Sequence, residues 1–210
     1  MKDLGGRGAH PRAVRPARQT ADLPPSYPQE YQRLVTLRDG RRVLIRPIQP
    51  SDAPALAESI ESADADTIRR RFFGGHPRVT PELLDYLTTV DYTSRFALVA
   101  VEPASQRGVA IARYEPAEQG GTADVAIAVT PDWRDVGLAT KLLRMLAQAA
   151  SERGVHTFTG TYLADNRPVM ALINEADEPA NQVTSRGITE FSVPLPPGSK
   201  APGPDHEGDR

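Results

Sequence analysis

Cysteine is absent from this chain of 210 residues. Its absence excludes disulfides, thiolate metal sites and a cysteine acyl-enzyme intermediate. The chain also lacks any apolar run of about 18 residues, the length needed to cross a membrane. Roughly the first thirty residues contain no apolar segment of the kind found in signal peptides. These absences predict a soluble, cytoplasmic protein.

A strong excess of charge of one sign is missing as well. The 25 Lys and Arg residues nearly balance 27 Asp and Glu residues, giving a net charge of -2. Without a basic excess, the whole protein has no electrostatic basis for binding DNA or RNA. No set of His, Asp and Glu has the spacing of metal ligands, so we expect no metal. The oligomeric state is not indicated by the sequence.

Both ends of the chain lack hydrophobic periodicity. Residues 1–28 are rich in Gly, Pro and Arg, and residues 198–210 are rich in Pro and charged residues. Neither composition can bury an apolar core, so both segments are predicted to be disordered tails, the first of them basic. One folded domain is expected over residues 29–197.

The domain begins with a predicted hairpin and three helices. Asp39-Gly40 lies between apolar runs at 33–37 and 43–45, a pattern typical of a two-residue turn with positive φ at both positions. Ser51 or Asp52 is expected to cap a first helix. A second helix carries Ile68 and the two phenylalanines that follow it. Thr80-Pro81 opens a third helix, since proline favours the first helical position.

Strands and helices then alternate to the end of the domain. Strands are predicted at 96–101, 108–114, 123–130, 156–162 and 188–193. A long amphipathic helix is expected from 135 to 153, closed by Gly154, and a shorter one begins at Arg167. This order predicts an α+β or mixed α/β fold, with helices on both faces of a sheet.

The junction between the strand at 123–130 and the long helix suggests an anion site. The first turn of a helix presents free N–H groups and a partial positive charge, which suit a pyrophosphate. Gly137 and Ala139 are small enough to allow close approach there.

The same junction resembles a known family. Arg134-Asp-Val-Gly-Leu-Ala139 is similar to the pyrophosphate loop of the GNAT acetyltransferases, Gln/Arg-x-x-Gly-x-Gly/Ala. Pro131-Asp-Trp133 before it and Asn166-Arg-Pro168 after the next strand also fit, and residues 41–173 follow the family order. The resemblance implies the GNAT fold, a twisted, mostly antiparallel central sheet flanked by helices on both faces. It also implies an N-acetyltransferase that uses acetyl-CoA.

The resemblance assigns most of the cofactor site to two segments. The backbone of the strand end would pair with the pantetheine arm of acetyl-CoA, and the loop with the first helical turn would hold the pyrophosphate. Asn166 would hydrogen-bond near the cofactor, although an asparagine there also serves as a helix N-cap. The residues of the two segments are Ile127, Ala128 and Val129, followed by Arg134, Asp135, Val136, Gly137, Leu138, Ala139 and Thr140.

Three positions and one segment depart from the family pattern. Asp124 stands where many members have a glutamate base; an ordinary aspartate, with a pKa of about 3.9, is a poor base unless burial raises that pKa. Asp135 replaces the usual glycine and puts a negative charge beside the pyrophosphate. Ile173 replaces the tyrosine that protonates the departing thiolate, and residues 175–181 replace a Gly-Phe segment.

A narrower resemblance concerns the acceptor side. Residues 68–74 and 83–92, followed by Phe96-Ala-Leu-Val-Ala100, resemble the bacterial protein lysine acetyltransferases of the Pat group. This implies transfer to protein lysine, with an acyl-CoA synthetase as one kind of partner. Asp91 and Glu115 are candidates for attracting a cationic lysine. Two alternatives stay open: a small-molecule amine acetyltransferase, and a weakly active module that binds acyl-CoA and has a regulatory role.

Overall fold

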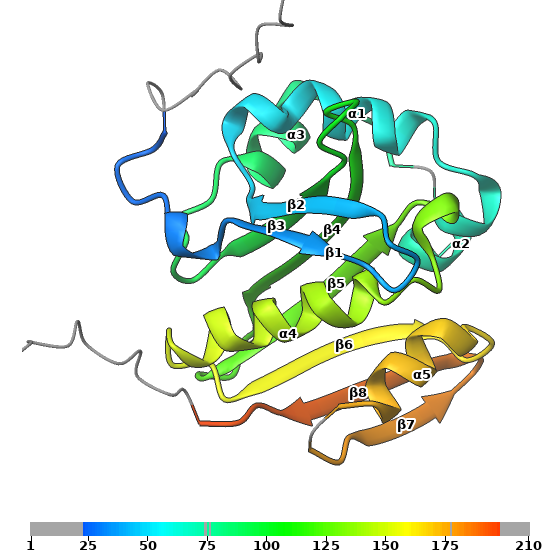
Figure 1. Ribbon diagram of the computed structural model, residues 1–210. Helices are drawn as coiled ribbons and strands as arrows, with labels where there is room; N and C mark the ends of the chain where they lie inside the picture. Colours follow the sequence, from blue (N-terminus) through cyan, green and yellow to red (C-terminus); the bar gives the residue numbers. More distant parts are fainter. Residues whose placement is uncertain (1–22, 74, 76, 177, 198–210) are drawn as a thin grey trace, which may run out of the picture.

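The computed structural model describes residues 23–73, 75, 77–176 and 178–197, and the segments at 1–22 and 198–210 that were expected to be disordered lie outside the described residues. One sheet of eight strands organises the domain, in the order β1-β2-β3-β4-β5-β6-β8-β7 (Figure 1). Every described pair of neighbouring strands is antiparallel except β5 and β6, which are parallel. The predicted mixed and mostly antiparallel sheet is confirmed.

The elements alternate much as the sequence predicts. The strands are β1 (Arg33–Thr36), β2 (Arg42–Pro47), β3 (Phe96–Val101), β4 (Gly108–Pro116), β5 (Thr122–Val129), β6 (Thr157–Leu163), β7 (Asn181–Ser185) and β8 (Ile188–Pro194). The helices are α1 (Ala53–Glu61), α2 (Ala65–Phe72), α3 (Pro81–Thr88), α4 (Leu138–Ser151) and α5 (Arg167–Asn174), with short 3₁₀ turns η1 (Gln29–Tyr31), η2 (Pro50–Asp52) and η3 (Pro131–Trp133). Among these helices, none has the length and apolar character needed to cross a bilayer.

Helices cover both faces of the sheet, and the side chains of β4 show how the faces divide. Arg113 donates a hydrogen bond to the carbonyl of Leu87 at the end of α3. Tyr114, the next residue, turns to the opposite face and stacks on Phe96, over which the guanidinium of Arg153 lies just beyond α4. Alternation along one strand therefore gives an α3 face and an α4 face. The main apolar core lies on the α4 face.

The described domain begins before residue 29. Tyr27 is only 8% exposed, its ring packs edge-on against Tyr92, and its hydroxyl donates to the carbonyl of Pro47 at 3.2 Å. The predicted boundary placed this residue in the tail. The sequence signal is weak because a single aromatic residue among prolines has no periodicity to mark it.

The first hairpin differs in detail from the expected two-residue turn. Only Gly40 has positive φ, at 85°, while Gly40 N donates to the carbonyl of Leu37 and Leu37 N donates to that of Arg41. This is a three-residue loop, a type I turn followed by a left-handed glycine. The loop brings Arg38 over the start of α4, where Arg38 N donates to the carbonyl of Val136.

Helix α4 starts three residues later than predicted, at Leu138, and ends two residues earlier, at Ser151, while Gly154 closes it as predicted. Asp135 and Gly137 have φ of 61° and 83°, so the backbone cannot be helical before Leu138. At the other end Gly154 N donates to Ser151 O and Val155 N to Ala150 O. These two bonds form a Schellman motif around Gly154, which has φ of 81°.

One other local prediction is wrong, and one strand was not predicted. Asp52 does not cap α1 with its side chain; the carboxylate instead accepts from Gln49 N and pairs with Arg46. Strand β7 was missed, because all five of its residues are exposed and Val183 is its one apolar side chain. It joins β8 through Arg186-Gly187, both with positive φ, a turn typical of tight hairpins.

Candidate active site

The site is built on the divergence of β5 and β6. The two strands pair only over Thr122–Asp124 and Thr157–Thr159, and then separate toward the end where α2 and α5 lie (Figure 1). Gly160 sits at the point of separation: a Cβ there would lie 2.8 Å from the ring of Phe191 and 3.2 Å from the carbonyl oxygen of Val125. Glycine at this position therefore allows β5, β6 and β8 to approach closely where the gap opens.

The edge of β5 that faces the gap can be assigned from its pairing with β4. Thr130 N donates to Val109 O, and Ala117 N donates to Thr122 O, so even-numbered residues of this strand direct their backbone groups to β4. The N–H and C=O groups of Ile127 and Val129 therefore face the gap, as the resemblance requires. Those of Ala128 point to β4, so only its side chain reaches the site.

The loop after β5 exposes a row of backbone donors. Gly137 is the N-cap of α4 and supplies no side-chain cap. Lys141 N donates to Gly137 O, whereas the N–H groups of Leu138, Ala139 and Thr140 have no hydrogen-bond acceptor among the described residues. Three free donors at the positive end of a helix form a ready anion site.

The negative charge of Asp135 is less unfavourable than the sequence implies. Its side chain is exposed to solvent. The position adopts the left-handed conformation, which Asp tolerates better than most residues other than glycine. Nearby, a Cβ on Gly137 would lie 3.2 Å from Nε of Arg38, so an arginine from the β1–β2 hairpin lies over the loop. Arg38 is a candidate residue that the sequence analysis missed, since nothing local connects it to the motif.

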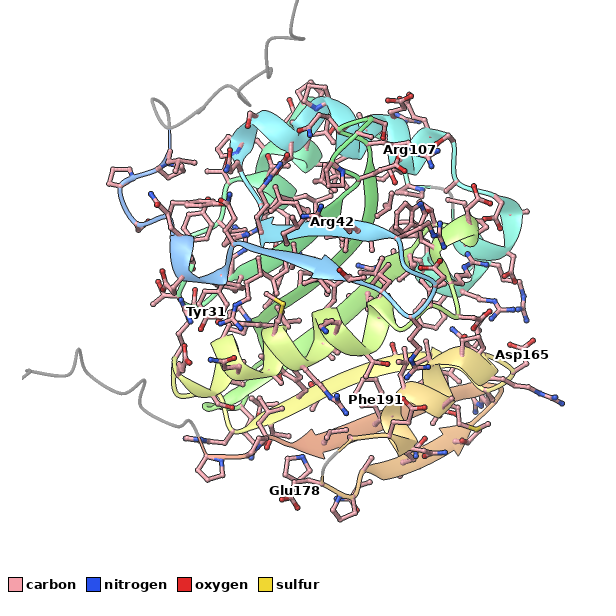
Figure 2. The ribbon with its side chains drawn as sticks, in the orientation of Figure 1. Tyr31, Arg42, Arg107, Asp165, Glu178 and Phe191 are labelled. Atoms are coloured by element: carbon pink, nitrogen blue, oxygen red, sulfur yellow. The ribbon has the colours of Figure 1, made fainter. Side chains whose placement is uncertain are left out.

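Helix α2 bridges the two sides of the open cleft. Arg134 donates to the carbonyl of Val129 at 3.2 Å and to the hydroxyl of Thr67 at 2.8 Å. On the opposite side Arg69 pairs with Asp165, labelled in Figure 2, at 2.7 Å. Arg70 donates to Oδ1 of Asn166 at 3.2 Å. Side chains of α2 therefore hold the loop after β5 and the start of α5 at a set separation.

Asn166 has one half of its amide engaged. Its Oδ1 accepts from Val169 N at 3.4 Å as the N-cap of α5, and from Arg70. The residue is 5% exposed and lines the cleft, and its Nδ2 has no acceptor among the described residues. The two predictions for Asn166, a helix N-cap and a hydrogen-bond donor to the cofactor, are therefore compatible. Its Oδ1 caps α5, and its Nδ2 is free to donate.

Two carboxylates lie side by side on the α3 face. Asp124 is directly opposite Glu115 in the β4–β5 register, so their side chains are neighbours. Asp124 is exposed and accepts from the Thr159 hydroxyl at 2.5 Å. Glu115 is less exposed and accepts from Arg113 and from Tyr86. The burial expected of an aspartate base is not found at Asp124.

Asp91 does not join these carboxylates. It accepts from the Ser94 hydroxyl and from the backbone N–H groups of Arg95 and Thr93, the latter two at 2.8 Å, and these bonds lower the pKa of its carboxyl despite its partial burial. Asp91 stabilises the turn before β3 and is not among the residues lining the cleft. Of the two residues expected to attract a lysine, only Glu115 is at the site.

At position 173 the structure places an apolar side chain. Ile173 is 8% exposed and packs with Tyr162 and Val193 in a small cluster of its own. Tyr162 lines the cleft, but its hydroxyl already donates to Gln182 on β7 at 2.6 Å. The region that the family uses for its tyrosine is thus an apolar wall.

Together these groups line one continuous cleft of about 1350 Å³. One end is formed by the free amides of α4 with Arg38 and Arg134, the middle by the open edge of β5, and the other end by Asp124, Glu115 and the face of α3. These three regions would match, in order, a ligand that has an anionic head, an amide-bearing arm and a polar reactive end. This geometry defines an acyl-CoA-dependent transferase.

Comparisons with known proteins agree. Residues 42–177 match the acetyltransferase (GNAT) domain. Acetyltransferase PA5475 of Pseudomonas aeruginosa is 32% identical over 139 residues, 65% of this chain and 75% of that protein. Acetyltransferase Pat of Mycolicibacterium smegmatis is 30% identical over 141 residues, 67% of this chain. The chain spans only 42% of that relative's length.

Among solved structures, the GNAT domain of S. lividans PAT superposes with a TM-score of 0.72 at 27% identity. The match covers 80% of this chain and 99% of that domain. The chain belongs to the GNAT family of acetyltransferases. It is an acetyl-CoA-dependent N-acetyltransferase, and acetyl-CoA is its co-substrate.

Proposed function

We propose that this protein transfers the acetyl group of acetyl-CoA to the side-chain amine of a protein lysine, by direct attack within a ternary complex. The observation that carries acetyl transfer is the alignment of the free amides of α4 with the open edge of β5. The similarity to Pat proteins supports lysine as the acceptor.

The acceptor end of the cleft is suited to a protein. Phe73 and Tyr86 line it and are 47% and 48% exposed, unusual for aromatic side chains of this size. Exposed aromatic residues are enriched at surfaces that bind other proteins. They would contact the methylenes of a lysine and its neighbours, while the chemistry takes place beside Asp124.

In the proposed complex each segment has a separate role. The amides of Leu138, Ala139 and Thr140, with Arg134 and Arg38, bind the diphosphate. Backbone groups of Ile127 and Val129 pair with the pantetheine amides as an added strand would. Val136 and Asp135 shape the loop, the side chain of Ala128 lines the arm, and Nδ2 of Asn166 donates to the cofactor.

The chemical step needs a proton acceptor. Near pH 7 only about 0.04% of lysine side chains are neutral, because their pKa is about 10.4. We assign the base to Asp124 from its position at the reactive end of the cleft. Because Asp124 is exposed, it acts through a water molecule and without the assistance of burial. The amine nitrogen attacks the thioester carbonyl, the C–N bond forms, and the C–S bond breaks. The proton lost by nitrogen passes to the water and Asp124, and CoA leaves as its thiolate because Ile173 supplies no acid.

Thiol release from acetyl-CoA tests this assignment, measured with lysine peptides, with polyamines and without an acceptor. We expect release that depends on the peptide. Asp124→Ala should keep acetyl-CoA binding and lower turnover by about 100-fold, the usual contribution of a general base. Turnover of Asp124→Ala is compared with that of Glu115→Gln, which removes the charge of the neighbouring carboxylate. Unchanged turnover in Asp124→Ala removes this residue from the mechanism.

The same assay separates the rival functions. Release stimulated by polyamines and not by peptides would identify a small-molecule enzyme. Binding of CoA without stimulation by any acceptor would identify a regulatory module. Gly137→Glu places a carboxylate in the diphosphate site and should abolish acetyl-CoA binding whichever of the three functions is correct.

A further inference from the structure

Three arginines surround one carboxylate at the acceptor end of the cleft. Arg113 donates to Glu115, and Arg95 lies 4.0 Å from the same carboxylate. Arg71, from α2, lines the cleft close enough to Arg113 and Glu115 to interact with both electrostatically. Tyr86 completes the group, with Arg95 over its ring at 3.9 Å and its hydroxyl on Glu115.

The charges of this group do not balance within the described residues. The side chain of Arg71 lies over the ring of Phe72 and has no hydrogen bond or ion pair with any described residue. The Nε atoms of Arg113 and Arg95 are buried without a hydrogen-bond partner in the described structure. Glu115 is the carboxylate that these arginines share, and Asp124 lies beside it, so three guanidinium groups face two carboxylates and one positive charge is in excess.

Burial makes this excess unfavourable. The side chain of Arg113 is only 7% exposed. Burial, followed by the nearby charge of Arg113, lowers the pKa of Arg71. Burial also lowers the pKa of Arg113, despite its pairing with Glu115. Two desolvated cations with free donors are stabilised when an anion joins them.

The position of the group indicates which ligand would bring that anion. Arg113 is opposite Ala126 and Glu115 is opposite Asp124, close to where β5 and β6 separate. The diphosphate site lies beyond the other end of β5, at the start of α4. Acetyl-CoA carries no anion at its acetyl end, so an anion that joins Arg71 and Arg113 in the cleft would come from the acceptor.

We infer that Arg71 and Arg113 form a carboxylate subsite that selects acceptor amines bearing an acidic group close to the reactive nitrogen. This inference rests on the proposed acetyl transfer and adds the class of acceptor. Glu115 holds Arg113 in place and keeps the net charge of the subsite moderate. A guanidinium pair is well suited to a carboxylate, because its planar donors match the two oxygens.

The carboxylate has two chemical sources. One is a Glu or Asp side chain one or two residues from the target lysine in a protein. The other is the free carboxylate of a small aminocarboxylic acid. Two matched acceptor pairs separate them: a lysine peptide flanked by Glu against the same peptide with Gln, and 5-aminovalerate against its carboxamide.

The test measures kcat/KM for both pairs with the wild-type chain and three variants. We expect the wild type to favour the acidic member of one pair about ten-fold, typical of a charge-assisted hydrogen bond. Arg71→Gln should reduce that ratio to about one while the KM for acetyl-CoA is unchanged. Arg71→Lys, which keeps the charge, should retain most of the preference.

Arg107→Gln is the matched control. Arg107 (labelled in Figure 2) is exposed in the turn between β3 and β4 and is not among the residues lining the cleft, so its loss should leave both ratios unchanged. No preference in the wild type, or a preference that survives in Arg71→Gln, overturns the inference while acetyl transfer stands.

A binding measurement keeps the inference testable if no acceptor is turned over. Acetylated forms of the two peptides are titrated into the CoA-bound protein by calorimetry. Tighter binding of the Glu peptide, lost in Arg71→Gln, supports the subsite even where the proposed function fails. Equal affinities overturn it.

Discussion

Two glycines at the ends of α4 show how a single residue can serve folding or function. Gly137 and Gly154 have nearly the same backbone conformation, with φ of 83° and 81°. A Cβ on Gly154 would meet nothing within 4 Å, whereas one on Gly137 would contact Arg38 and project beside the free amides. Both positions need a left-handed residue, and only the first borders the cleft.

Gly137→Ala and Gly154→Ala therefore form a matched pair. Each should lower the free energy of unfolding by about 1 kcal/mol, the cost of left-handed backbone for alanine. Only Gly137→Ala should also weaken acetyl-CoA binding, by about ten-fold. Urea unfolding and calorimetry check the two effects. An equal loss of affinity in both variants contradicts the diphosphate site.

Arg38 makes a second prediction at this scale. Its side chain is exposed beside Gly137 and has no ion pair with a described residue, so it is free to contact a phosphate. Arg38→Gln should weaken acetyl-CoA binding about three- to five-fold, a modest effect because solvent screens the charge. Arg42→Gln, an exposed arginine on β2 (Figure 2), is the control and should bind normally. Equal affinities in the two variants remove Arg38 from the site.

Among secondary-structure elements, α2 has the largest influence on the site. It has eight residues, and ion pairs link it to Arg134 on one side of the cleft and to Asp165 on the other. Its N-cap is Asp64, whose carboxylate accepts from Thr67 N at 2.9 Å and from the Thr67 hydroxyl at 2.6 Å. The cap and the ion pairs together determine how α2 spans the cleft.

Replacing Asp64 tests this element. Asp64→Ala should lower the free energy of unfolding by about 1 kcal/mol at pH 7. The hydrogen bonds from Thr67 lower the pKa of Asp64, so its stabilisation is complete above the unfolded value near 3.9. The difference from wild type should therefore shrink as the pH falls through the folded-state pKa.

Asp64→Asn provides the control for that pH dependence. Asparagine caps helices as well as aspartate does but does not titrate. Its unfolding free energy should stay close to that of the wild type at pH 7. A difference between Asp64→Ala and wild type that persists unchanged at low pH would show that the carboxylate is not the stabilising group.

At the scale of the whole molecule, the N-terminal segment closes the core. Tyr27 packs on Tyr92, and Tyr31 packs on Phe96 at a centroid distance of 5.3 Å. Tyr31 also donates to Glu152 just after α4, and burial together with this bond raises its pKa to about 12. These contacts join the start of the described chain to β3 and the end of α4.

Truncation tests where the domain begins. A chain starting at Leu23 should be more stable to urea by about 3 kcal/mol than one starting at Gln29, since the latter loses a buried aromatic ring. In the full chain, Tyr27→Phe should cost about 1 kcal/mol, the value of its hydrogen bond to Pro47. Equal stabilities of the two truncated chains would restore the boundary predicted from sequence.

The sequence by itself determined the order of the elements other than β7, the closure of α4 by Gly154 and the start of α3 at Thr80, where the hydroxyl accepts from Leu83 N. It also predicted the turn at Gly137 that precedes the free amides of α4. These features depend on neighbours within a few positions, so local chemistry was sufficient to predict them. The exposed strand β7 lacked such a signal.

Only the tertiary structure decided which distant side chains meet. Arg38 reaches Gly137 through a hairpin, the pairing of β5 with β4 turns the amide of Ala128 away from the gap, and Asp124 is left exposed. The group of arginines around Glu115 comes from α2, β4 and the segment before β3. Its unbalanced charge depends on burial and through-space distance, and neither is encoded in the spacing of residues along a chain.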